Sequence, residues 1–228
     1  MTAADYAKAR RTLMRRDPVL GAVIKQHGPC GLAESQHTDP FKALISAIVS
    51  QQLSTRAAAT IQARFEALFA TPVKAGKPLR DARGHGGRFP TPERVMEVSD
   101  EQLRAVGFSR MKVSFVRDLC GRVMDGSLRL QDLDALDDEA VIAELVAVKG
   151  IGRWTAEMFL MFRLHRPDVL PVGDLGIVRG FQKVYGWKKE PSPAKMTRTA
   201  EAWRPYRSIA CWYLWEHLEN VPIKDRKD

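Results

Sequence analysis

A Gly-X-Gly turn between two helical segments has the pattern of an anion-binding site. The stretch 146–160 reads VAVKGIGRWTAEMFL, in which an apolar helix ends, Gly150 and Gly152 follow, and a second helix begins at once. Glycine permits positive φ and close backbone approach, so the N–H groups from Gly150 onward would lie at a helix N-terminus and bind a phosphate. The carbonyl groups of Val146, Val148 and Gly150 could hold a sodium or potassium ion. As an isolated turn, this pattern is more often structural than functional.

Asp174 is the second group whose position could do chemistry. It opens a predicted helix within residues 170–181, LPVGDLGIVRGF. An aspartate at a helix start is usually an N-cap, because its side chain accepts a backbone N–H. A carboxylate held there can also stabilise positive charge in a transition state, or orient and deprotonate a water. The residue types alone leave both interpretations open.

The composition favours a polyanionic partner. The 228 residues include 36 Lys+Arg and 27 Asp+Glu, a net charge of +9, which favours nucleic acid over a membrane. The charged N-terminus lacks the apolar region of a signal peptide, and no run has the length of a membrane span, so we expect a cytoplasmic protein. Cys30, Cys120 and Cys211 are widely spaced and the histidines form no metal-binding pair, so we expect no iron–sulfur cluster, zinc or other cofactor.

The hydrophobic pattern predicts an all-α fold of about ten helices. The clearest signal begins at Asp39 and Pro40, an N-cap followed by proline at the first helical position, after which apolar residues recur at helical spacing through 41–49. The one alternation typical of a strand, within 128–133, is too short to predict one. Residues 71–92 are rich in proline, glycine and basic side chains and are predicted to form a loop, either a solvated insertion or a phosphate contact.

Four segments together resemble the helix-hairpin-helix DNA glycosylase superfamily and occur in that family's order. They are 47–54 (AIVSQQLS), 148–156 (VKGIGRWTA), 170–181 (LPVGDLGIVRGF) and 203–208 (WRPYRS). The first resembles the loop that plugs the gap left by a flipped-out base, the second the hairpin, and the third the stretch that holds the catalytic aspartate. The fourth, with Trp212 and Trp215, resembles the C-terminal end of the bacterial 3-methyladenine DNA glycosylase II family. The resemblance covers roughly residues 35–218.

The resemblance implies one glycosylase unit, residues 1–228, made of two packed helical subdomains. Residues 40–150 would form the central subdomain, and residues 1–39 with 151–228 the terminal one. The active site would lie in the cleft between them, beside the helix-hairpin-helix motif. The chain has no room for the N-terminal β-rich domain of the enterobacterial enzyme, and it lacks the four-cysteine cluster of the endonuclease III branch.

The resemblance also implies the site residues. Asp174 would be the catalytic group. The flipped base would be held by Trp154, Met158, Leu175 and Trp215. Met158 and Leu175 lie where the related enzyme has tyrosines, so the pocket would be less aromatic. Gln52 is the first candidate for the wedge that fills the DNA gap, and Leu53 is the second. The hairpin residues that bind a DNA phosphate would be Lys149, Gly150, Ile151, Gly152, Arg153 and Thr155.

The resemblance further predicts hydrolysis without strand cleavage. Bifunctional members of the superfamily use a lysine nucleophile on the helix just after the hairpin, and it forms a Schiff base. Trp154 occupies the matching position, and neither Lys149 nor Arg153 does. We therefore expect an intact abasic strand as the product.

The function implied is that of a monomeric, nucleoid-associated enzyme of base excision repair, which removes 3-methyladenine and 7-methylguanine from double-stranded DNA. An alkylated purine carries positive charge and leaves readily. Two alternatives stay open. One is a glycosylase for other damaged or deaminated bases. The other is a non-catalytic helix-hairpin-helix DNA-binding module, which would need neither Asp174 nor the pair Trp154 and Trp215.

Overall fold

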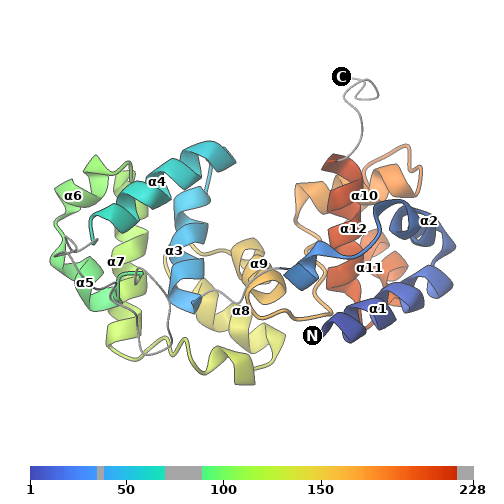
Figure 1. Ribbon diagram of the computed structural model, residues 1–228, viewed down its shortest axis with the longest axis horizontal. Helices are drawn as coiled ribbons and strands as arrows, with labels where there is room; N and C mark the ends of the chain where they lie inside the picture. Colours follow the sequence, from blue (N-terminus) through green and yellow to red (C-terminus); the bar gives the residue numbers. More distant parts are fainter. Residues whose placement is uncertain (35–38, 70–88, 220–228) are drawn as a thin grey trace, which may run out of the picture. The chain divides into compact units, whose positions relative to one another are not determined.

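The computed structural model describes residues 1–34, 39–69 and 89–219, and every regular element in these ranges is helical (Figure 1). The α-helices are α1 (Ala3–Arg16), α2 (Pro18–His27), α3 (Pro40–Ser50), α4 (Thr55–Ala67), α5 (Pro92–Glu97), α6 (Asp100–Ala105), α7 (Arg110–Met124), α8 (Asp138–Val146), α9 (Arg153–Phe162), α10 (Leu175–Val184), α11 (Pro193–Ala200) and α12 (Arg207–Glu219). Short 3-10 helices span Gly31–Glu34, Leu133–Ala135 and Glu201–Trp203. The all-α prediction is confirmed. Most of the predicted basic loop, at 71–88, lies outside the described residues.

Two of these helices were not expected from the hydrophobic pattern. Helix α1 begins at a capping box in which the Thr2 and Asp5 side chains each accept a backbone N–H of the other residue. Helix α5 begins at the N-cap Thr91 with Pro92 in its first turn. Both helices bury few side chains, so their start signals are stronger than their apolar periodicity. No helix in the described ranges is long and apolar enough to span a membrane.

The chain divides into two compact units. The terminal unit comprises Met1–His37 and Glu157–Asp228, and the central unit comprises Thr38–Ala156. The resemblance implies a second boundary near residue 150, whereas the structure has the whole Gly-X-Gly hairpin and the first turn of α9 in the central unit. The physical reason is local packing, because the hairpin lies against the side chain of Phe115 on α7.

The core of the central unit forms around α3 and α4. The predicted apolar face of α3 is buried at Phe41, Leu44, Ile45, Ile48 and Val49. Phe65 of α4 is fully buried and stacks on Phe108, with ring centroids 5.4 Å apart. This packing holds α3 in place, so the loop that leaves its C-terminus starts from a rigid element.

The core of the terminal unit surrounds a buried carboxylate, Asp17, which is 8% exposed. Its Oδ1 accepts the N–H groups of Val19 and Leu20 (3.1 and 3.0 Å) and so caps α2. Its Oδ2 accepts the indole N–H of Trp203 (2.8 Å) and the hydroxyl of Tyr185. A buried charge is tolerated when such hydrogen bonds compensate its desolvation. Asp17 therefore ties α2 to the C-terminal half of the same unit.

Candidate functional site

Asp174 caps α10 and is held by a second donor from α12. Its Oδ1 accepts the backbone N–H of Ile177 (2.8 Å) and the indole N–H of Trp215 (2.9 Å). The side chain is half-buried. Both donors and the positive end of the α10 dipole stabilise negative charge on this carboxylate. The N-cap interpretation is therefore correct, and the same contacts fix the orientation of the carboxylate.

Gly176 allows the contact between Asp174 and Trp215. A Cβ at Gly176 would stand 2.8 Å from Cδ1 of Trp215 and 3.0 Å from Oδ1 of Asp174. One turn later, a Cβ at Gly180 would stand 2.8 Å from Cβ of Leu214. The two glycines face α12, so α10 and α12 approach closely. Sequence reasoning did not single out Gly176, although its spacing of four from Gly180 places both on one helix face.

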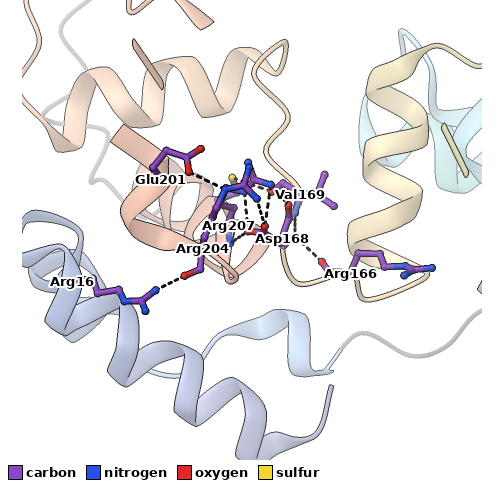
Figure 2. Close-up of polar contacts among 9 residues, drawn as sticks. Arg16, Arg166, Asp168, Val169, Glu201, Arg204 and Arg207 are labelled. Atoms are coloured by element: carbon purple, nitrogen blue, oxygen red, sulfur yellow. Dashed lines mark hydrogen bonds and ion pairs between the residues drawn. The ribbon is translucent and has the colours of Figure 1, made fainter. Parts of the chain in front are cut away.

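The arginines of the WRPYRS motif make internal ion pairs (Figure 2). Arg207 binds the Asp168 carboxylate with Nε (2.8 Å) and Nη2 (3.0 Å), and its Nη2 also donates to the Asp168 carbonyl (2.7 Å). Arg204 donates to the same carboxylate (2.8 Å) and to Glu201 (3.0 Å), and its carbonyl accepts from Arg16. A forked, half-buried pair of this kind fixes geometry as well as charge. The motif therefore holds the loop after α9 in place.

Helix α12 holds both ends of the segment that leads to the candidate catalytic carboxylate. The Ser208 hydroxyl accepts from the N–H of Val169 (2.9 Å) and donates to the carbonyl of Arg166 (2.6 Å). Two turns later on α12, Trp215 holds Asp174. Seven residues of α-helix rise about 10.5 Å. The spacing of Ser208 and Trp215 on one rigid helix thus sets the length that this segment must span.

Three predicted base-pocket residues lie in the terminal unit. Trp215 is half-buried and stacks on Phe162, with ring centroids 5.9 Å apart and an interplanar angle of 25°. Leu175 is 56% exposed and follows Asp174, and Met158 is half-buried. The fourth residue, Trp154, lies in the central unit on the first turn of α9 and is 48% exposed. Phe162 was missed, although Met158 precedes it by four residues on α9 and thus shares its helix face.

The terminal unit contains a second carboxylate, Glu157, that the sequence analysis did not single out. Glu157 is 6% exposed, on α9. Burial raises the pKa of the Cys211 thiol, and the negative charges of Asp174, Glu157 and Asp168 raise it further. Carboxylates from three segments therefore act on one buried group in the terminal unit.

The two glycines of the hairpin (residues 148–155) have different reasons to be glycine. Gly150 has φ +80°, and a Cβ there would stand 2.2 Å from the ring of Phe115. Gly152 has no such positive φ, and a Cβ there would meet nothing within 4 Å. The fold therefore requires Gly150, whereas the open space beside Gly152 suits the close approach of a partner's backbone.

Lys149 is engaged by an acidic residue of α7. Its backbone N–H donates to Oδ2 of Asp118 (2.9 Å), and its Nζ lies 3.7 Å from Oδ1. Burial raises the pKa of Asp118, but the hydrogen bonds from Lys149 and Arg122 and the charges of both residues outweigh that effect and hold this pKa below its usual value. The Lys149 N–H is thus used for internal support, and only its side chain, 67% exposed, remains suited to a phosphate.

The other hairpin residues likewise have some groups that make contacts within the protein and some that are exposed. The Ile151 side chain is buried, and its N–H donates to the carbonyl of Val148 (3.1 Å) within the turn. The Thr155 side chain is also buried. Arg153 is 58% exposed and pairs with Glu139 (3.0 Å), and this hydrogen bond lowers the pKa of Glu139. Arg153 would have to leave Glu139 to bind a phosphate, which costs little at an exposed pair.

The two wedge candidates lie on a tight turn after α3. Gln51 has φ −52° and ψ 128°, Gln52 has φ 58°, and the Leu53 N–H donates to the Ser50 carbonyl (3.1 Å). These are features of a type II turn, whose third residue is normally glycine because it needs positive φ. Gln52 is exposed and Leu53 is 39% exposed. A glutamine with positive φ costs of order 1–3 kcal/mol and is typical of functional sites.

The hairpin carbonyls fit a monovalent cation in their chemistry. The Val148 carbonyl accepts from Ile151, and the Gly150 carbonyl accepts from Nε2 of Gln51 (2.8 Å). Each carbonyl oxygen has a second lone pair, so both could still face the ion that we proposed for Val146, Val148 and Gly150. Within the described ranges, no group of three or more His, Cys, Asp or Glu could hold a metal ion.

Known proteins are similar to this chain in sequence and in fold. Residues 45–205 match the model of the HhH-GPD superfamily base excision DNA repair proteins. DNA-3-methyladenine glycosylase 1 of Schizosaccharomyces pombe is 34% identical over 194 residues, which cover 83% of this chain and 78% of that protein. DNA-3-methyladenine glycosylase 2 of Escherichia coli is 29% identical over 78% of this chain and 57% of its own length.

Two solved structures support the assignment. A DNA-3-methyladenine glycosidase of Bacillus halodurans has a TM-score of 0.78 at 37% identity, over 93% of this chain and 89% of that one. The S. pombe 3-methyladenine DNA glycosylase in complex with abasic DNA has a TM-score of 0.73 at 30% identity, over 93% of this chain and 97% of that one. On the evidence of its helices, its hairpin and these matches, the chain belongs to the HhH-GPD superfamily of base excision DNA repair proteins.

Proposed function

We propose that this protein is a monofunctional DNA glycosylase that removes alkylated purines, such as 3-methyladenine and 7-methylguanine, from double-stranded DNA and leaves an abasic site. The observation that carries the proposal is the carboxylate of Asp174, which Ile177 and Trp215 hold at the start of α10 within the residues that match the family. Relatives named as 3-methyladenine glycosylases support the substrate class.

The Asp174 carboxylate suits glycosidic bond cleavage. Breaking an N-glycosidic bond builds positive charge on the sugar, as in glycoside hydrolysis. A carboxylate beside that sugar stabilises the charge electrostatically and can orient or deprotonate the attacking water. Because a carboxylate already held by two donors needs little reorganisation, its stabilisation of the transition state is larger than that of a free side chain.

Aromatic faces suit an electron-poor base. A base must leave the stack before its glycosidic bond can be reached. Trp215 and Phe162 stack in the terminal unit, and Trp154 exposes about half its surface in the central one. A cationic alkylpurine would gain roughly 1–2 kcal/mol from such faces when desolvated. The aliphatic Met158 and Leu175 add apolar contact without further rings.

Hydrolysis alone is the expected chemistry. A lyase step needs an amine nucleophile near the sugar. Trp154 stands where bifunctional members of the family have their lysine, and the nearby Lys149 is paired with Asp118. The abasic strand should therefore stay intact until another agent cleaves it.

The hairpin would bind a phosphate of the DNA, and the wedge turn (residues 50–53) would enter the base stack. The open space beside Gly152 and the exposed side chains of Lys149 and Arg153 suit a phosphate. Gln52 would fill the gap left by the flipped base. As an extension of this proposal, the enzyme would act as a monomer at the nucleoid, in the cytoplasm.

The test is base release from alkylated duplex DNA under single-turnover conditions. Wild type is compared with Asp174→Asn and with Asp137→Asn, a matched control. Asp137 is also an N-cap, accepting from Ala140 (2.8 Å) on α8, so its substitution repeats the capping change away from the proposed chemistry. We expect release by wild type and by Asp137→Asn, and a loss of at least about 100-fold in Asp174→Asn.

Strand breaks are scored with and without alkali. Breaks that require alkali support hydrolysis, whereas breaks without alkali contradict the monofunctional assignment. If wild type releases no methylpurine, the same assay on uracil, hypoxanthine and mismatched bases tests the alternative substrate class. Binding without release from any of these substrates would identify a DNA-binding module and reject the enzyme proposal.

A further inference from the structure

The wedge turn is held at its central peptide group by a lysine from α7. Nζ of Lys112 donates to the carbonyl of Val49 (2.7 Å) and to that of Gln51 (2.8 Å). The Gln51 carbonyl belongs to the peptide group that precedes Gln52, and the orientation of that group sets the φ angle of Gln52. Burial lowers the pKa of Lys112. Because it holds the Gln51 carbonyl, the Lys112 ammonium group fixes the plane of the peptide group before Gln52 and so keeps Gln52 in its positive-φ conformation.

The same face of α7 supports the hairpin. Lys112, Phe115 and Asp118 follow one another at intervals of three residues and so lie along one side of the helix. The Phe115 ring fills the space where a Cβ of Gly150 would be, and Asp118 accepts the N–H of Lys149. One rigid helix thus contacts both the wedge turn and the hairpin.

A direct hydrogen bond joins the two loops as well. Nε2 of Gln51 donates to the Gly150 carbonyl (2.8 Å). The wedge turn is therefore bonded at its backbone to α7 and at a side chain to the hairpin. All of these contacts lie within the central unit, which is compact by itself.

We propose that Lys112 is a positioning residue that presets the wedge, holding Gln52 in the conformation in which it enters the DNA while α7 keeps the hairpin in register with it. The inference rests on the proposed function, because it assigns the wedge turn a task in base flipping. Lys112 itself touches neither the sugar nor the base.

The conformation of Gln52 supports this assignment. A glycine at position 52 would adopt positive φ without strain, so the turn geometry does not explain a glutamine there. A strained backbone conformation at an exposed residue persists when the surrounding structure holds it in place. A preset wedge also loses less conformational freedom when the DNA binds than a mobile one would.

The experiment compares Lys112→Met with wild type on two substrates. In the first, the alkylated base is paired and stacked in a duplex. In the second, the same lesion lies in a single-base bulge, where extrusion costs less. We expect Lys112→Met to reduce base release from the paired lesion by about tenfold or more and from the bulge far less, because a small misplacement of a positioning group costs up to about 100-fold.

Four further proteins sharpen the comparison: two single variants at lysines, Gln52→Ala, and Gln52→Ala combined with Lys112→Met. Lys112→Arg keeps donors at this position and should retain most of the activity. Lys25→Met, at an exposed lysine on α2, is the matched control for charge and should behave like wild type. In a Gln52→Ala background, Lys112→Met should have no further effect, since residues that act through one another are not additive.

Amide hydrogen exchange at Leu53 tests the positioning without any activity. The Leu53 N–H closes the wedge turn, so its exchange should become faster in Lys112→Met and stay unchanged in Lys25→Met. Unchanged exchange would overturn the inference, and so would equal losses of activity on the paired and the bulged lesion. If wild type releases no base at all, the proposed function fails, and the exchange at Leu53 then decides the positioning claim alone.

Discussion

Replacement of Trp215 by phenylalanine separates two contributions of this side chain. Phenylalanine keeps a ring to stack on Phe162 but removes the indole N–H that donates to Asp174 (2.9 Å). A hydrogen bond to a charged group contributes about 1.5–3 kcal/mol. If the carboxylate needs this bond to face the sugar, the rate constant of base release should fall about 10- to 100-fold.

The assay is single-turnover base release, together with DNA affinity and unfolding by urea. The affinity of Trp215→Phe for DNA with an abasic-site analogue should stay near that of wild type, because the hairpin residues are unchanged. The free energy of unfolding should fall by about 1.5–3 kcal/mol, the contribution of the lost hydrogen bond, and the variant should remain folded. A slower chemical step with intact binding and folding is thus the expected signature.

Gly176→Ala perturbs the same contact from the other side. Its Cβ would stand 2.8 Å from Trp215 and 3.0 Å from Asp174, so the indole must shift. Gly180→Ala is the matched control, because it crowds Leu214 on the same helix pair, one turn farther from the carboxylate. Gly176→Ala and Trp215→Phe should combine with less than additive losses of rate. Wild-type rates in Trp215→Phe would refute the positioning of Asp174 by the indole.

Three other predictions concern the hairpin and the fold. Gly150→Ala should lower the free energy of unfolding, measured by urea titration, by about 3 kcal/mol, because it combines positive φ with overpacking. Gly152→Ala should leave this free energy within about 1 kcal/mol of wild type but weaken DNA binding, measured by fluorescence anisotropy. Equal effects of the two substitutions would contradict the separate roles assigned to the two glycines. Asp17→Asn should lower the free energy of unfolding by about 2–4 kcal/mol, since four donors would lose a charged acceptor. A variant with the free energy of unfolding of wild type would show that the buried charge is dispensable. The pKa of Asp118 is lower in the folded than in the unfolded protein, so its contribution to stability is present above about pH 4 and is lost as the pH falls through the folded pKa. Between pH 6 and 3, the free energy of unfolding in urea should therefore fall less in Asp118→Asn than in wild type. An identical dependence of this free energy on pH in the two proteins would refute the assignment.

Most helices could be predicted because their start signals are local. Asp39 before Pro40 caps α3 as expected, and Ser99 and Ser192 cap α6 and α11 by the same kind of local contact. A cap depends on contacts within about three residues, which the sequence order alone determines. The missed helices α1 and α5 carry the same kind of signal, but their weak apolar periodicity hid them.

The sequence proposes residue types for the candidate site but not the contacts among them. The motif order pointed to Asp174, and its N-cap geometry follows from its place before α10. The bond from Trp215 could not be predicted, since 41 residues separate the partners. The same holds for the pairing of Lys149 with Asp118, 31 residues apart, which commits the Lys149 N–H to a contact inside the protein.

By itself, the sequence determined that this protein is helical, where most of its helices begin, and that a glycine hairpin precedes a capping aspartate. The tertiary structure alone decided which glycine is required by the fold, because only the Phe115 ring distinguishes Gly150 from Gly152. It also decided that Lys112 reaches the wedge turn. The physical reason is range: helix caps and turns depend on neighbours in the chain, whereas close packing and side-chain hydrogen bonds join residues that meet only when the core has formed.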